Sequence, residues 1–118
     1  MKAKPRLIDV AALEAALQKF ADERDWQQYH SPKNLAMALT GEVGELVEIF
    51  QWLTEEKSKE VARDPSTARA VRDEIADVLL FLVRLSSVLG VDLNEAVTTK
   101  LASNAVKYRA GDSTPKRN

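Results

Sequence analysis

The stretch GEVGELVEIFQW, residues 41–52, has the spacing of a helix but places glutamates among its apolar positions. A helix advances about 100° per residue, so residues three, four and seven apart share one side. The side that carries Glu42 and Glu45 also carries a set of apolar residues: Leu35, Leu39, Leu46, Ile49 and Leu53. The stretch therefore predicts a helix that brings two carboxylates into an apolar seam, with Glu48 off to one side.

The segment DEIADVLLFL, residues 73–82, repeats this arrangement. Glu74 and Asp77 lie three residues apart and share a side with further apolar residues: Val71, Val78, Phe81 and Leu85. Burying an ionised carboxylate costs on the order of several kcal/mol, and four that lie together repel one another. A compensating positive charge is therefore expected beside the four acids.

Two kinds of positive charge could compensate the acids. Arg72 and Arg84 could form ion pairs with them, as acids on helical surfaces often do. A divalent cation is the alternative, and four carboxylates suit magnesium, manganese or calcium better than zinc. The single histidine, His30, cannot supply the two E-x-x-H motifs of a di-iron bundle. Because magnesium sites commonly bind substrate phosphates, a metal here favours hydrolysis of a phosphate ester or anhydride.

Capping signals divide the chain into helices. Four long helices are expected, opened by Asp9, by Ser31-Pro32, by Asp64-Pro65 and by Asp92 with Glu95. They are expected to end near residue 25, Leu53, Leu89 (before Gly90) and Arg109. Residues 54–64 read as a charged loop with at most one helical turn, residues 1–8 as a flexible N-terminus and residues 110–118 as a disordered tail. Four helices with short connections predict an all-α four-helix bundle.

Two glycines stand inside the second predicted helix. Gly41 and Gly44 each cost roughly 1 kcal/mol relative to alanine at a helical position. We expect close approach by another helix or by a ligand to account for them.

Composition narrows the classes of function. A chain of 118 residues forms one domain by the usual expectation. Its net charge of −1 gives no reason to expect a nucleic acid or an anionic membrane as partner. The absence of cysteine excludes disulfides, thiolate metal sites and cysteine nucleophiles. The stretch MKAKPRLID lacks the apolar run of a signal peptide, and no segment approaches transmembrane length, so a cytoplasmic location is expected.

The spacing E42-x-x-E45 followed by E74-x-x-D77 resembles the signature of the all-α nucleoside triphosphate pyrophosphohydrolases, the MazG-like superfamily. Two longer stretches, ERDWQQYHSPKNLAMALTGEVGELVEIFQW at 23–52 and VDLNEAVTTKLASNAVKYR at 91–109, are similar to its dCTP pyrophosphatase branch. The resemblance covers residues 9–109 and implies a MazG-like domain there. It further implies that the four acids are the catalytic ligands of Mg²⁺, for which Mn²⁺ could substitute.

The same resemblance implies a set of substrate contacts. It places Trp26, His30 and Trp52 around the base and sugar, and three residues of the last helix beside the phosphates and deoxyribose: Lys100, Asn104 and Tyr108. Their i, i+4, i+8 spacing independently predicts one polar stripe on that helix, which could also be an ordinary solvent-facing stripe. Without the resemblance, the two tryptophans read equally well as packing residues and His30 as a local hydrogen-bonding residue.

Phe81 departs from the pattern, because eukaryotic members of the family carry tyrosine at this place on the metal-bearing face. The lost hydroxyl leaves the fine substrate preference open. The resemblance implies cleavage of dCTP or a 5-modified dCTP to the monophosphate and pyrophosphate. A dUTPase-like or broad-specificity pyrophosphatase, or a non-catalytic helical module with its acids paired to arginines, remains an alternative.

Assembly is also expected. The third predicted helix is apolar around most of its circumference, as shown by Leu79, Leu80, Leu82 and Val83. Such a helix needs cover on several sides, which one chain supplies poorly. The resemblance likewise implies a homo-oligomer, a dimer of dimers with active sites near subunit boundaries.

Overall fold

The computed structural model of the chain describes residues 8–109 and 111, and these residues form helices and no strand. The elements are α1 (Val10–Glu23), the 3₁₀ helix η1 (Gln27–Tyr29), α2 (Pro32–Phe50), the single turn α3 (Glu55–Ser58), α4 (Ala68–Leu89) and α5 (Leu93–Lys107). The predicted all-α class is therefore confirmed. The predicted flexible N-terminus and disordered tail fall outside the described residues, apart from Ile8 and Gly111.

Most of the predicted helix boundaries rest on caps that the structure shows. The Asp9 carboxylate accepts the backbone N–H groups of Ala11 and Ala12 at 3.0 and 3.3 Å. Ser31 accepts from the backbone of Asn34 at 3.2 Å, and Asp92 accepts from that of Glu95 at 3.0 Å. Gly90 ends α4 with a φ of 71°, the left-handed conformation that glycine adopts without strain. Thr54 caps α3, the one helical turn expected in the charged stretch.

The start of α4 differs from the prediction. The signal Asp64-Pro65 does not open this helix, which begins at Ala68. Asp64 instead accepts the backbone N–H and the hydroxyl of Ser66, at 2.9 and 2.7 Å, and so closes a local turn. An aspartate side chain that accepts hydrogen bonds from a residue two positions later favours a turn over a helix, and α4 accordingly starts one turn later.

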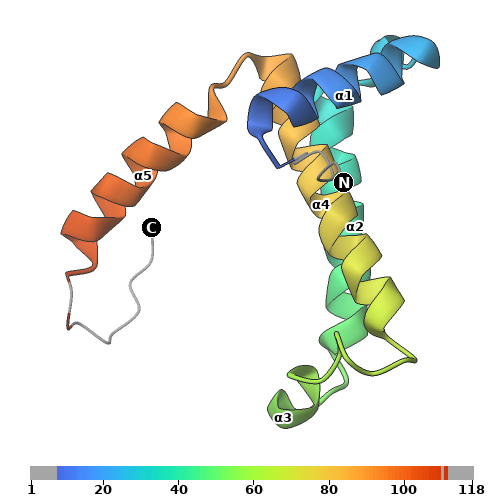
Figure 1. Cartoon of the computed structure of the whole chain (residues 1–118), viewed down its shortest axis with the longest axis vertical. Helices are drawn as coiled ribbons and strands as arrows, with labels where there is room; N and C mark the ends of the chain where they lie inside the picture. The colour runs from blue at the N-terminus through green and yellow to red at the C-terminus, as the bar shows by residue number, and fades with distance from the viewer. Residues whose placement is uncertain (1–7, 110, 112–118) are drawn as a thin grey trace, which may run out of the picture.

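Helices α2 and α4 lie side by side along their lengths, and α1 packs across the C-terminal half of α4 (Figure 1). Their contact forms the small core of the chain: Leu13, Ala21, Leu35, Val71 and Val83, with Val61 from the connection before α4. This pairing sets the faces that carry the predicted acids toward each other.

Helix α5 stands apart from these three helices (Figure 1). Its apolar residues Val97, Leu101 and Val106 are exposed, Leu101 by 64%. The described chain thus forms three packed helices and a separate fourth, rather than a four-helix bundle closed within one chain. The sequence pattern marked α5 as a helix but could not say which helices it packs against.

The glycines of α2 also differ from expectation. A Cβ atom added at Gly41 or Gly44 would meet nothing within 4 Å. No other helix of the described residues therefore approaches these two glycines closely, and the expected approach of a ligand stays a prediction.

Among the described residues, no helix is both long and apolar enough to span a membrane. The cytoplasmic location stays a prediction.

Candidate metal centre and adjoining pocket

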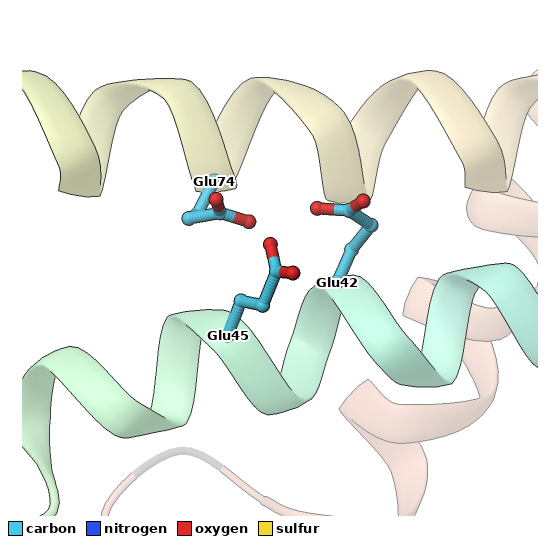
Figure 2. A group of neighbouring side chains, drawn as sticks. All are labelled: Glu42, Glu45 and Glu74. Atoms are coloured by element: carbon cyan, nitrogen blue, oxygen red, sulfur yellow. The ribbon is translucent and has the colours of Figure 1, made fainter.

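Three of the four predicted acids meet between α2 and α4. Glu42 and Glu45 of α2 and Glu74 of α4 each offer one carboxylate oxygen, and these oxygens all lie within 4.8 Å of one another. Figure 2 shows the three side chains pointing into the space between the two helices. Glu42 and Glu74 are half-buried and Glu45 is exposed. We call these residues the carboxylate trio.

The trio concentrates negative charge. The pKa of Glu74 is raised to about 7, first because its carboxyl can share a proton with Glu42, then because of burial. The hydrogen bond to Glu45 and the charges of both neighbours raise this pKa further. One oxygen of Glu42 and one of Glu74 are buried without a hydrogen-bond partner. Buried acceptors of this kind need a cation or a donor.

Arginine does not supply that cation within the described residues. The ion pairs there join Lys59 to Glu56, Arg63 to Glu60 and Arg69 to Asp73. Of the arginines expected to pair with the acids, Arg72 bonds the Ala68 carbonyl and Arg84 bonds neutral side chains. The oxygens of the trio are therefore not paired with arginine in the described chain. Carboxylate oxygens are hard ligands, and two of these oxygens have no hydrogen-bond partner, so the trio fits a divalent cation such as Mg²⁺.

Asp77, the fourth predicted ligand, is not part of this group. It lies three residues beyond Glu74 on α4 and lines a pocket between α1, α2 and α4. The spacing placed Asp77 on the same helix as Glu74, but no carboxylate oxygen of Asp77 belongs to the group whose oxygens lie within 4.8 Å of one another. Glu48 also lies outside the trio, as predicted, although it borders a shallow hollow together with Glu45 and Glu74.

The pocket that Asp77 borders is mainly apolar, with a volume of about 290 Å³. Three predicted substrate contacts meet in it: Trp26, His30 and Phe81. Trp26 meets the rings of Phe20 and His30 edge to face, at centroid distances of 5.5 and 6.1 Å. The remaining wall is formed by other side chains: Leu17, Leu35, Leu80 and Arg84. We call this cavity the ring pocket.

The end of α1 explains why Trp26 enters the ring pocket. Asp25 adopts a φ of 54°, and the backbone N–H of Trp26 reaches back to the carbonyl of Ala21 at 2.9 Å. The N–H of Asp25 bonds the Asp22 carbonyl at 3.2 Å. These two bonds form a Schellman motif with aspartate in the place usually held by glycine. The motif reverses the chain and turns the indole back over the helix.

Sequence reasoning missed the polar partners of His30. Arg84 is only 5% exposed, and its Nε donates to Nδ1 of His30 at 3.0 Å. Its Nη1 donates to Oε1 of Gln18 at 2.7 Å. Burial, followed by the charge of Arg84, lowers the pKa of His30. The available signal was the position of Arg84, three residues after Phe81 and seven after Asp77, which places it on the pocket side of α4.

Four predicted contacts lie away from the trio and the ring pocket. Trp52 is 87% exposed just beyond α2, at the opposite end of the α2–α4 pair from the end of α1 (Figure 1). Trp52 therefore lies apart from the ring pocket that Trp26 lines in the described chain. Of the other three residues, Lys100 and Asn104 lie on the separate helix α5, and Tyr108 is the residue that caps its C-terminal end.

Comparison with known proteins adds a family and several relatives. The sequence profile of the MazG-like family matches residues 38–115, which include all four acids. The chain is 44% identical over 105 residues to dCTP pyrophosphatase 1 of Bos taurus and of Mus musculus, and 44% identical over 107 residues to that of Homo sapiens. These matches cover 89–91% of this chain but only 60–61% of the relatives, so the chain spans about three fifths of their length.

A solved structure shares the fold. The crystal structure of a pyrophosphatase from Archaeoglobus fulgidus DSM 4304 matches with a TM-score of 0.78 and 38% identity. The match covers 92% of this chain and 99% of that one.

Proposed function

We propose that this chain, which belongs to the MazG-like family, is a metal-dependent nucleotide pyrophosphohydrolase. Its substrate in this proposal is dCTP or a 5-modified dCTP, and its products are the monophosphate and pyrophosphate. The observation that carries the proposal is the carboxylate trio, whose two buried oxygens lack partners, beside a pocket with an indole wall. Its cellular role would be to clear surplus or non-canonical deoxycytidine nucleotides.

The metal proposed for the trio is Mg²⁺, with Mn²⁺ as a substitute that takes the same oxygen ligands. Glu42, Glu45 and Glu74 would hold it, and Asp77 would be the fourth ligand or would hold a water beside it. Bound there, the ion would neutralise charge on the phosphate oxygens. Glu74, with its pKa raised to about 7, must lose its proton before the site can take the ion.

The ring pocket would hold the base. Ligand pockets commonly measure about 300–1,000 Å³, so a cavity of about 290 Å³ is at the small end of this range and has room for a single base. Stacking on Trp26 would contribute roughly 1–3 kcal/mol for any base. Phe81 adds apolar contact without a hydroxyl, and His30 can bond the edge of the ring.

We also propose a homo-oligomer, a dimer of dimers, as the active form. The supporting observations are the separate position of α5, its exposed apolar residues and the buried Asn104 Oδ1 that has no hydrogen-bond partner. Exposed Leu79 and Leu82 leave α4 open to a second copy as well. In such an assembly, α5 or Trp52 of one copy could complete the site of another and bring Lys100 to the phosphates.

The base assignment is tested with a panel of deoxynucleoside triphosphates. We expect dCTP or 5-methyl-dCTP to show the highest kcat/KM, with each product identified by chromatography. A preference for dUTP would support the dUTPase-like alternative, equal rates would support a broad-specificity enzyme, and a preference for purines would contradict the ring pocket. Absence of hydrolysis for every triphosphate would leave a non-catalytic module.

A further inference from the structure

Arg84 is a buried cation without a carboxylate partner among the described residues. A guanidinium has five N–H donors and no acceptor, and a buried one is stable only when its donors are bonded. Two of these donors are taken by His30 and Gln18. The three residues come from different parts of the chain, since Gln18 lies on α1, His30 follows η1 and Arg84 lies on α4. Such an arrangement fixes the position of each side chain.

The bond to His30 determines where the imidazole carries its proton. Because arginine can only donate, Nδ1 of His30 must accept and therefore carries no proton. The neutral ring then holds its proton on Nε2. Burial and the positive charge of Arg84 both favour the neutral ring, since both lower the pKa of His30. Within the described residues, Nε2 makes no hydrogen bond.

We propose that Arg84 is a positioning residue that locks His30 in the Nε2-protonated tautomer, so that the ring pocket offers a fixed N–H donor to the base. Arg84 lines the same pocket and has further N–H groups, so these two residues donate and do not accept, whereas Asp77 supplies an acceptor to the same pocket. A buried donor left without an acceptor is destabilising. The pocket therefore favours a ring that presents acceptors at this place.

The locked donor deepens the proposed function and rests on it for the choice of base. Cytosine presents two neighbouring acceptors, N3 and O2, on its pairing edge. Uracil and thymine carry a hydrogen on N3, so N3 of these bases cannot accept the N–H of His30 as N3 of cytosine can. The tautomer of His30 thus gives the ring pocket a means to prefer cytosine, which stacking on Trp26 cannot supply.

The tautomer can be measured without any nucleotide, because His30 is the single histidine of the chain. In protein labelled with ¹⁵N-histidine, long-range proton–nitrogen NMR at neutral pH should show one imidazole with Nε2 protonated and Nδ1 bare. Arg84→Met should give a mixture of tautomers, whereas Arg69→Met, an exposed arginine on the same helix, should leave the spectrum unchanged. A wild-type ring protonated on Nδ1 would overturn the proposal.

The effect of Arg84 on the preference between bases is measured by the ratio of kcat/KM for dCTP to kcat/KM for dUTP. We expect this ratio to fall about tenfold in Arg84→Met, which corresponds to one hydrogen bond of about 1.4 kcal/mol, and to stay constant in Arg69→Met. His30→Gln should keep most of the discrimination, since its amide accepts from Arg84 and still donates, whereas His30→Leu should lose it. Far-ultraviolet circular dichroism checks that each variant folds.

The two experiments separate the possible failures. If the wild-type chain hydrolyses no triphosphate, the proposed function fails, while the NMR result still decides the tautomer. If the chain is active and Arg84→Met keeps both its tautomer and its dCTP preference, the positioning role is wrong. If His30→Gln and His30→Leu lose the same share of the preference for dCTP over dUTP, the proposal is also contradicted. Glutamine keeps an N–H donor and leucine does not, so equal losses would mean that the donor does not matter.

Discussion

At the scale of single residues, Glu74 is a described acid whose pKa is raised well above its ordinary value. Its carboxyl faces Glu42 and Glu45 across the gap between α4 and α2 (Figure 2). Clustered carboxylates of one sign raise the pKa of at least one member, and that member then binds either a proton or a cation. In the proposed function, Glu74 would exchange this proton for a metal ion, which would link the charge of the site to its chemistry.

Replacing Glu74 by glutamine should therefore abolish most of the activity. We expect kcat/KM to fall about a hundredfold or more, the scale on which loss of a charge-stabilising group is felt. Asp73→Asn is the matched control, because Asp73 is the neighbouring acid of the same helix and pairs with Arg69 on the surface. Steady-state hydrolysis assays compare the two, and near-wild-type turnover in Glu74→Gln would show that the trio does not hold the metal.

The raised pKa of Glu74 also predicts how stability depends on pH without metal. Between about 4.5, its ordinary value, and about 7, the folded chain holds a proton that the unfolded chain has released. The free energy of unfolding should therefore decrease as pH rises through this window and level off above it. Urea unfolding at several pH values measures this slope. The slope should shrink in Glu74→Gln, and an unchanged slope in that variant would place the effect elsewhere.

At the scale of elements, the ring pocket depends on how α1 ends. The Schellman motif at Asp25 turns Trp26 toward His30, and α4 brings Phe81 to the same cavity. Three elements thus supply one binding surface. The ring pocket adjoins the trio, because Asp77, which lines the pocket, follows Glu74 by three residues on α4.

Trp26→Ala should weaken substrate binding more than it slows chemistry. Loss of a stacking surface worth roughly 1–3 kcal/mol should raise KM for dCTP by about tenfold or more, with kcat changed much less. Tyr29→Ala, an exposed aromatic in η1, serves as the control. A loss confined to kcat would mean that Trp26 acts on the reaction and not on the base.

The sequence predicted these elements unevenly, for physical reasons. Caps are local, so Asp9, Ser31 and Asp92 could be recognised from their neighbours alone. Asp64 failed as a cap because a serine two residues later offered it a closer partner. Periodicity assigned Glu42, Glu45 and Glu74 to facing sides of two helices, which contact then confirmed.

Other features depended on tertiary contacts that no local pattern encodes. The bond from Arg84 to His30 joins residues 54 positions apart. The place of Asp77 in the ring pocket depends on the packing of α1 and α2 against α4, and the position of α5 depends on contacts between helices that are far apart in the sequence. The family resemblance placed Trp26 and His30 around the base, and their rings lie together in the ring pocket, but it could not show which of its contacts one chain assembles by itself.

At the scale of the whole molecule, α5 and Trp52 are the parts that a single chain leaves exposed. Leu101 is 64% exposed on α5, and Trp52 is 87% exposed beyond α2. We propose that a second copy of the chain covers these exposed apolar residues, as in the assembly proposed above. The predicted contacts Lys100, Asn104 and Tyr108 would reach a site only in such an assembly.

Leu101→Lys should therefore lower both the molecular mass and the activity. We expect multi-angle light scattering at micromolar concentration to return an oligomer for the wild type and a smaller species for the variant. The control is Lys19→Leu, which changes the charge of an exposed position on α1 and should leave the mass unchanged. A monomeric wild type with full activity would contradict the assembly and the role given to α5.

The most direct measurement of the proposed chemistry is product analysis of dCTP incubated with the wild-type chain. With Mg²⁺ present, chromatography should show dCMP and pyrophosphate in equal amounts, and a chelator should stop their formation until Mg²⁺ is restored. Release of inorganic phosphate with dCDP, or hydrolysis that continues unchanged in the chelator, would contradict the assignment of the carboxylate trio as the metal centre of a pyrophosphohydrolase.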